Sequence, residues 1–297
     1  MKLVTYRIDQ KQKVGVLSVD GEWVYPICNA GIDYGTMLEL IKNVSEPELQ
    51  LLEIASKKQP QDIQDPVKKA QVHILAPIPH PEQDILCLGQ NYADHAKESA
   101  RYKKELFPTE NKFPVYFSKR VWEATADGDP IPSHPSVTEK LDYEAELAVI
   151  LWKDATNVSP EEAKDYVLGY TVLNDVSARD VQERHKQWYM AKSLDGFCPM
   201  GPCIATRDDF AYPPELPVRS YVNGELRQDG NTASFIFSLD YVISELSKGM
   251  TLRAGTIIST GTPAGVGMGF DPPKFLKPGD VVECEVEGVG KITNRVE

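Results

Sequence analysis

Short segments with the composition of β-strands recur along most of the chain, and helical segments are few. Beyond residue 80 the candidate strands are 84–89, 145–152, 169–174, 218–222, 256–260 and 281–286. The candidate helices there are 94–106, 160–167 and 239–247. Many short strands with few helices favour a β-rich α+β fold over a doubly wound parallel sheet. Asn223-Gly224, after one of these strands, predicts a hairpin turn.

The opening segment has a pattern of its own. Alternating apolar and polar residues predict strands at 3–8, 14–19 and 23–26, with a tight turn at Asp20-Gly21. Apolar residues three and four apart predict helices at 37–41 and 47–57. Three prolines then interrupt regular structure, at Pro77, Pro79 and Pro81. We therefore expect a small N-terminal α/β domain, residues 1–72, and a larger domain, residues 73–297.

Charge and cysteine content limit the class of protein. Among 297 residues, 32 Lys and Arg oppose 44 Asp and Glu, which gives a formal net charge of −12. Such a charge repels nucleic-acid phosphates, and no apolar run approaches the length of a membrane span. The five cysteines are odd in number and widely spaced, which indicates reduced, buried thiols rather than disulfides. We expect a soluble cytoplasmic protein with no nucleic-acid or membrane partner.

Three acidic residues form a candidate metal site. Glu144 and Glu146 are two apart in a predicted strand, so both side chains point to one face. A divalent cation would offset their repulsion, although an exposed strand with two solvated acids fits this pair equally well. Asp175 ends another apolar strand and supplies a third carboxylate. Oxygen ligands without His or Cys favour Mg²⁺ or Mn²⁺ over Zn²⁺.

Other residues have a functional and a structural interpretation. His95 and Glu98 are three apart in a predicted helix, so Glu98 could orient His95 as a general base. A solvated helix face is favoured for them, because Lys97, Arg101, Lys103 and Lys104 are near. The loop around Thr262, rich in Gly, Thr and Pro, could bind an anion. Lys192 follows aromatic and apolar residues and could be a buried cation, although a surface lysine is commoner.

An ordered series of motifs resembles the fumarylacetoacetate hydrolase superfamily. The series reads GQNYADHAKE, LDYEAELAV, LNDVSARDVQ, AKSLDGFCPMGP, VNGELRQ, LSKGMTLRAGTIISTGTPAGVG and PPKFLKPGDVVECEVEGVG. It runs from about residue 74 to the end, and the opening segment is similar to the small N-terminal domain of many bacterial members. The stretches HKQWYMAKSLD and FDPPKFLKPGD are similar to the bacterial YisK-like branch, which contains oxaloacetate decarboxylases.

The resemblance implies a fold and a set of site residues. The large domain would be a mixed β-sandwich roll, usually in a homodimer, with Mg²⁺ or Mn²⁺ held by Glu144, Glu146 and Asp175. His95 and Glu98 would form a catalytic dyad on a segment that often belongs to a mobile lid. Gln182 and Thr262 would contact substrate, and Lys192 would serve both binding and catalysis.

The resemblance also implies a reaction. A divalent metal would assist cleavage of a C–C bond in a small-molecule 2-oxo acid through an enolate, by an oxaloacetate decarboxylase or an acylpyruvate hydrolase. One alternative is an isomerase or hydratase of 2-hydroxymuconate-type or 2-hydroxyhepta-2,4-diene-1,7-dioate substrates. Another is a partner-binding protein with a vestigial site. Fumarylacetoacetate itself is disfavoured, because a further metal-binding acid of that enzyme, upstream of the dyad histidine, has no clear match here.

Overall fold

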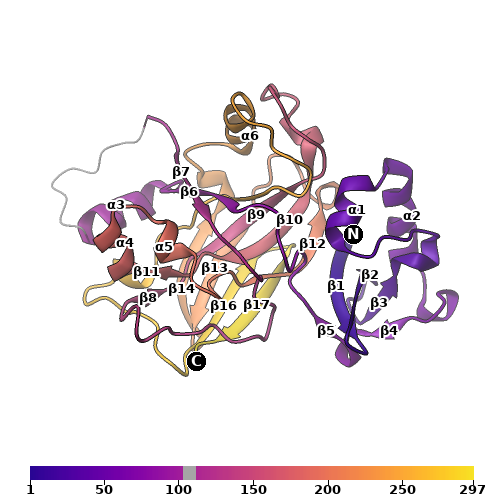
Figure 1. Cartoon of the computed structure of the whole chain (residues 1–297), viewed down its shortest axis with the longest axis horizontal. Helices are drawn as coiled ribbons and strands as arrows, with labels where there is room; N and C mark the ends of the chain where they lie inside the picture. Colours follow the sequence, from indigo (N-terminus) through magenta and orange to yellow (C-terminus); the bar gives the residue numbers. More distant parts are fainter. Residues whose placement is uncertain (103–111) are drawn as a thin grey trace.

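The computed structural model describes residues 1–102 and 112–297. Within these residues the strands form an eleven-stranded sheet, a four-stranded sheet and a two-stranded ribbon. Helices lie around them, so the fold is a strand-rich α+β arrangement, as the sequence predicts (Figure 1). None of the described helices is long and apolar enough to cross a bilayer.

The N-terminal part consists of five strands at one end of the large sheet, with two helices packed on them. Its elements are β1 (Lys2–Ile8), β2 (Lys11–Leu17), β3 (Trp23–Pro26), α1 (Met37–Asn43), α2 (Glu46–Ser56), β4 (Val67–Lys68) and β5 (His73–Ile74), with 3₁₀ turns at Ile27–Ala30, Pro60–Asp62 and Lys69–Gln71. Both helices begin with a capping box, in which a hydroxyl and a glutamate three residues later satisfy two helix N–H groups. The helices bury Leu40, Ile41 and Leu52 against the sheet.

This part shares a sheet with the rest of the chain. β1 pairs with β12 (Met200–Thr206), with Lys2 opposite Ala205, and β5 pairs with β1. Figure 1 shows β1 to β3 with α1 and α2 gathered on one side of the molecule. The division into two domains at residues 72 and 73 therefore stays a prediction, and the large sheet runs across it.

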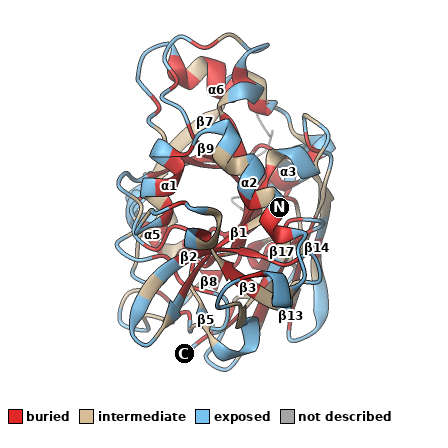
Figure 2. Ribbon diagram, turned by 90° about the vertical axis from the view of Figure 1, so that its right-hand side faces the viewer, coloured by how far each residue is buried: buried red, intermediate tan, exposed pale blue. Residues whose placement is uncertain are grey.

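Two central antiparallel strands explain the longest apolar runs. The large sheet continues from β12 through β10 (Val167–Asn174), β9 (Ala145–Leu151), β15 (Ile257–Ser259), β6 (Ile85–Gly89) and β7 (Val115–Lys119). Every residue of β9 and β10 is buried. Leu147 and Val149 pack into one apolar cluster while Ala148 and Ile150 pack into another, on the opposite face. Burial on both faces is why these strands do not alternate with polar residues (Figure 2).

The four-stranded sheet packs over β9 and β10. Its strands are β13 (Pro217–Val222), β14 (Glu225–Asn231), β16 (Val281–Val286) and β17 (Gly290–Arg295). Alternate residues of β13 and β16 are buried, including Val218, Val222 and Val282, which face the core. Asn223 and Gly224 take positive φ values of 52° and 79° between β13 and β14, which confirms the predicted hairpin turn.

The remaining elements lie around the two ends of the central strands. They are α3 (Ala93–Tyr102), β8 (Leu141–Asp142), β11 (Ser177–Ala178), α4 (Arg179–His185), α5 (Tyr189–Lys192) and α6 (Leu239–Ser247), with 3₁₀ turns at Ala163–Tyr166, Arg207–Asp209, Thr232–Ser234 and Gly267–Gly269. The helix predicted at 94–106 is confirmed to Tyr102, and residues 103–106 lie outside the described residues. The helix predicted at 160–167 is wrong, because only one 3₁₀ turn forms before Val167 enters β10.

The cysteines are free thiols. Cys87, Cys198, Cys203 and Cys284 are buried, and Cys28 is exposed. Burial raises the pKa of Cys203 to about 11 and of Cys198 to about 12, so both stay neutral near pH 7. The sequence prediction of buried structural thiols holds for four of the five.

Candidate active site

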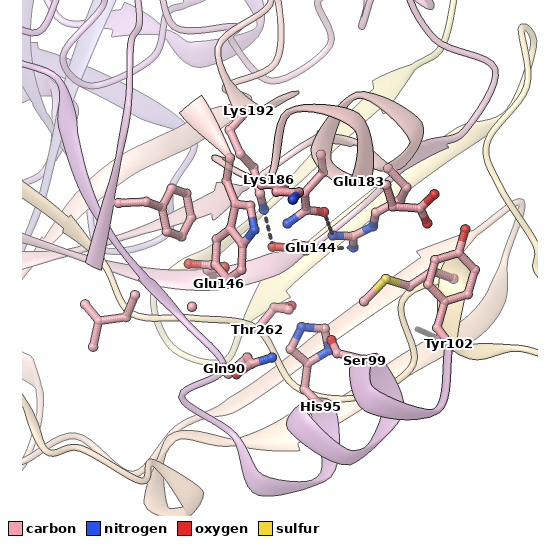
Figure 3. A pocket seen from close by; sticks show the side chains of 17 residues that line it. Gln90, His95, Ser99, Tyr102, Glu144, Glu146, Glu183, Lys186, Lys192 and Thr262 are labelled. Atoms are coloured by element: carbon pink, nitrogen blue, oxygen red, sulfur yellow. Dashed lines mark hydrogen bonds and ion pairs between the residues drawn. The ribbon is translucent and has the colours of Figure 1, made fainter. Parts of the chain in front are cut away.

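One cavity is lined by six of the eight candidate site residues, the exceptions being Glu98 and Asp175. It has a volume of about 380 Å³, and α3, α4, α5 and the ends of the central strands contribute its lining (Figure 3). Its lining comprises Leu88, Gly89, Gln90, His95, Ser99, Tyr102, Phe117, Glu144, Glu146, Arg179, Gln182, Glu183, Lys186, Trp188, Lys192, Thr262 and Met268. A water takes roughly 30 Å³ in the liquid, so a small organic acid and several waters fit.

Strand register brings the three acids of the candidate metal site together. Leu173 of β10 lies opposite Glu146, and the Asp175 N–H donates to the Glu144 carbonyl at 2.8 Å. One carboxylate oxygen from each of Glu144, Glu146 and Asp175 lies within 4.8 Å of the others, and all three residues are buried. Antiparallel pairing thus places the acid after β10 beside the two acids at the start of β9.

Buried cations hold two of these carboxylates. Lys192 Nζ lies 2.7 Å from Glu144 Oε2 and 2.6 Å from Asp175 Oδ2, while Arg179 NH2 lies 2.7 Å from Glu144 Oε1. Burial alone would raise the pKa of Glu144, but Lys192 and Arg179 outweigh it and hold that pKa below its ordinary value. Glu144 is therefore ionised near neutral pH.

Glu146 has a different environment. Its Oε2 accepts from Ser259 Oγ at 2.5 Å and from the Gly261 N–H at 2.9 Å, which are neutral donors. Burial, followed by the negative charges of Asp175 and Glu144, raises its pKa well above the ordinary range. A divalent cation among the three carboxylates would supply the charge that Glu146 lacks, and the all-oxygen donor set suits Mg²⁺ or Mn²⁺. These residues therefore fit the metal that the resemblance implies.

The dyad is buried rather than solvated. His95 and Glu98 lie on one face of α3, and His95 Nδ1 is 3.2 Å from Glu98 Oε2. The Gly265 N–H donates to the Glu98 carboxylate at 3.1 and 3.3 Å. Gly269 leaves the space that Glu98 fills, since a Cβ there would lie 1.7 Å from Glu98 Oε1. The structure therefore contradicts the solvated-face interpretation and matches a base with an orienting acid.

The predicted substrate contacts line the cavity, but several of their hydrogen bonds are already made. The Thr262 hydroxyl donates to the Ala145 carbonyl at 2.9 Å and accepts from Gln228 Nε2 at 2.6 Å. Gln182 Oε1 accepts from Arg179 NH1 at 3.2 Å, which leaves the Gln182 amide N–H groups as donors. Lys192 donates to Glu144 and Asp175 of the candidate metal site.

Sequence reasoning missed two groups that hold these residues. Lys119 ends β7, is fully buried and donates to Asp175 Oδ1 at 2.8 Å. Asp142 accepts from Arg179 Nε at 2.9 Å and from the Gly267 and Met268 N–H groups at 2.7 and 3.0 Å. Asp142, Glu144 and Glu146 are each two residues apart, so the spacing could have identified Asp142 as a candidate site residue from the sequence. Nothing local marks Lys119 as buried.

The chain is similar to known proteins over most of its length. A family described as "Fumarylacetoacetate (FAA) hydrolase C-terminal" matches residues 84–297. The oxaloacetate tautomerase YisK of Bacillus subtilis (strain 168) is 47% identical over 227 residues, which cover 76% of this chain and 74% of YisK.

Solved structures of other proteins superpose on this chain over its full length. A fumarylacetoacetate hydrolase from psychrophilic Exiguobacterium antarcticum superposes with a TM-score of 0.84 at 37% identity, covering 100% of this chain and 99% of that one. A maleylpyruvate hydrolase from Sphingobium sp. SYK-6, in complex with manganese(II) ion and pyruvate, gives a TM-score of 0.78 at 28% identity, covering 100% and 98%. The family match, the YisK relative and the shared fold together show that this chain belongs to the fumarylacetoacetate hydrolase family.

Proposed function

We propose that the cavity is the active site of a divalent-metal-dependent enzyme that moves protons on 2-oxo acids of the oxaloacetate type, interconverting their keto and enol forms. The observation that carries this proposal is that His95, backed by Glu98, lines the same cavity as Glu144 and Glu146. A base and a cation site are thus arranged around one small space. The name of the YisK relative, an oxaloacetate tautomerase, supports this choice of reaction.

Glu144, Glu146 and Asp175 would hold the metal. When bound, Mg²⁺ or Mn²⁺ would polarise the 2-oxo group and stabilise negative charge on its oxygen. An ion held by these three carboxylates would keep positions open to water or substrate oxygens. Asp142 and Lys119, through their contacts to Arg179 and Asp175, fix the geometry of this ligand set.

His95 would move the proton. With its Nδ1 proton donated to Glu98, Nε2 is the free acceptor. Nε2 would take a proton from C3 of the keto acid, and the carboxylate of Glu98 would stabilise the imidazolium. Return of that proton to the former 2-oxo oxygen completes the enol, and the reverse path restores the ketone. Gln182 amide N–H groups would orient the substrate.

Cleavage of a C–C bond, the reaction predicted from the sequence, stays a prediction. It would pass through the same enolate, with CO₂ leaving from oxaloacetate or an acyl group leaving after water attack. The maleylpyruvate hydrolase relative supports this second candidate. Tautomerisation belongs to the class that the sequence analysis held as an alternative, in which no bond to carbon other than C–H changes.

The test is a panel of substrates and metals. Keto–enol exchange of oxaloacetate is followed by ultraviolet absorbance, pyruvate release reports decarboxylation, and acetylpyruvate loss reports hydrolysis. Each assay is run with Mn²⁺ and with EDTA, on the wild type, His95→Gln and Glu146→Gln. We expect exchange that needs metal and both side chains; exchange that is unaffected by EDTA and by Glu146→Gln contradicts the proposal. Activity on none of the substrates would favour a partner-binding role.

We also propose a cytoplasmic homodimer, on family resemblance. Light scattering coupled to gel filtration should give twice the chain mass of 33.1 kDa. A mass equal to that of one chain would contradict it.

A further inference from the structure

We propose that Lys186 binds the second carboxylate of the substrate, so that the site selects 2-oxo dicarboxylates over 2-oxo monocarboxylates. The inference rests on the proposed function, because it assumes that the first carboxylate and the 2-oxo group bind at the metal end of the cavity. It names the substrate class that the same cavity takes. The structural basis is the position of this lysine at the cavity wall, between α4 and Trp188.

The cations that line the cavity are not equivalent. Arg179 and Lys192 are buried and already paired with Glu144, and each contacts a further acid, Asp142 or Asp175. Lys186 also lines the cavity, but in residues 1–102 and 112–297 no carboxylate lies within ion-pair distance of its ammonium. A second substrate carboxylate would therefore find one lysine whose charge is not already matched.

Another acid at the cavity wall does not neutralise Lys186. Glu183 lies on α4 and its Oε2 is 3.7 Å from Lys140 Nζ, which also donates to Tyr102 OH at 3.0 Å. Glu183 is thus drawn towards Lys140. In Figure 3 Lys186 lies on the side of the cavity opposite His95, whereas Glu183 lies nearer Tyr102.

The backbone at Lys186 is unusual for a residue with a Cβ. Lys186 follows the last residue of α4 with φ 59° and ψ −23°, a left-handed helix end. Glycine adopts this conformation without steric strain, whereas lysine does not. At this strained position the chain carries the Lys186 side chain. Arg179 and Gln182 of the preceding helix, α4, line the same cavity.

Trp188 fixes this segment against the sheet. Its ring meets Phe117 edge to face at 5.0 Å between centroids. It also packs over Gly89 so closely that a Cβ there would lie 2.2 Å from the indole. Phe117 offers only its ring to this wall, and Trp188 adds a single neutral donor, its indole N–H. This wall carries no charge, so the charge that would balance a distal carboxylate here comes from Lys186.

The experiment compares two substrates, oxaloacetate and its 4-methyl ester, in which a methyl group removes the distal charge. Keto–enol exchange is measured for each with Mn²⁺. Lys186→Met should lower kcat/KM for oxaloacetate about 10-fold and change that for the ester less than about 3-fold. Lys186→Arg should retain the preference for oxaloacetate. Arg184→Met, which removes an equal charge from α4 outside the cavity lining, is the matched control and should leave both values unchanged.

Equilibrium binding of two 2-oxo acids, measured without any turnover assay, separates this inference from the proposed function. Calorimetry with Mn²⁺ present compares 2-oxoglutarate with 2-oxopentanoate, in which a methyl group replaces the distal carboxylate. The wild type should bind 2-oxoglutarate more tightly, and Lys186→Met should remove that preference. If Lys186→Met lowers the affinity for both probes equally, or changes neither affinity, the role of Lys186 is overturned. Absent turnover with the binding preference intact contradicts only the proposed reaction.

Discussion

Lys192 Nζ lies 2.7 Å from Glu144 Oε2, so a lysine expected to bind substrate is paired with an expected metal ligand. Its ammonium also contacts Asp175 Oδ2, which places a positive charge between two acids of the triad. Burial by itself would lower the pKa of Lys192, but Asp175 and Glu144 raise it above its ordinary value. Lys192 therefore stays charged at neutral pH and would compete with a metal ion for the same carboxylates.

Removing this ammonium should separate catalysis from metal binding. In Lys192→Met, turnover should fall about 100-fold, because a positive charge that lines the cavity is lost. Mn²⁺ should bind at least as tightly as in the wild type, because a competing cation is gone and two carboxylates are released. Electron paramagnetic resonance of free Mn²⁺ measures the affinity. Weaker Mn²⁺ binding in this variant would contradict the competition between Lys192 and the metal.

The Ser259 hydroxyl should raise the metal affinity of the candidate site through its hydrogen bond to Glu146. Its hydroxyl donates to Glu146 Oε2, so Ser259→Ala leaves this buried carboxylate with one fewer donor. We expect Mn²⁺ affinity to fall about 10-fold or more, as for other residues that orient metal ligands. Ser220→Ala is a matched control, because Ser220 is also fully buried and its hydroxyl has no hydrogen-bond partner among the described residues. Equal effects of the two changes would count against the role of Ser259.

The absence of a side chain at Gly269 should be required for Glu98 to reach His95. In Gly269→Ala the new methyl group would overlap Glu98, which must then leave His95 or the Gly265 N–H. We expect kcat to fall about 10-fold to 100-fold, similar to Glu98→Gln, with Mn²⁺ affinity nearly unchanged. At Gly249 a Cβ would meet nothing within 4 Å, so Gly249→Ala serves as the control. Wild-type kcat in Gly269→Ala would show that the Glu98 position is not needed.

Alkaline pH should destabilise the fold through its buried thiols. Burial raises the pKa of Cys203 to about 11 and of Cys198 to about 12, above the value near 9 of an exposed thiol. A raised folded-state pKa stabilises the protein below pH 9, and this contribution is lost as the pH rises from 9 towards 12. At pH 10 the loss is about 1.4 kcal/mol for each such thiol.

Urea unfolding at pH 8 and pH 10 measures this change. The free energy of unfolding should decrease between the two values, and Cys203→Ala should show a smaller decrease than the wild type. Identical values at pH 8 and pH 10 would mean that these thiols do not titrate on unfolding. Ellman's reagent should modify Cys28 quickly in the folded protein and all five thiols in denaturant.

Much of the architecture was predictable from local pattern. The alternation of β2, the capping-box helices and the Asn223-Gly224 turn are determined by residues close together in the chain, and each formed where expected within a few residues. The helix expected at 160–167 failed because Val167 enters a buried strand, and pairing with β9 outweighs local helix preference. α4 and α5 carried too few residues to show a periodic pattern.

The sequence alone determined the family, the β-rich fold class and the chemical identity of the three acids and the dyad, because motif order and residue type suffice for those. Only the tertiary structure decided that His95 and Glu98 are buried and that Lys192 is paired with Glu144. It also decided the contacts of Lys119 with Asp175, Ser259 with Glu146 and Gly265 with Glu98, which join residues 56, 113 and 167 positions apart. Such contacts depend on strand order and on how loops cross the sheet, and no local periodicity in the chain encodes either.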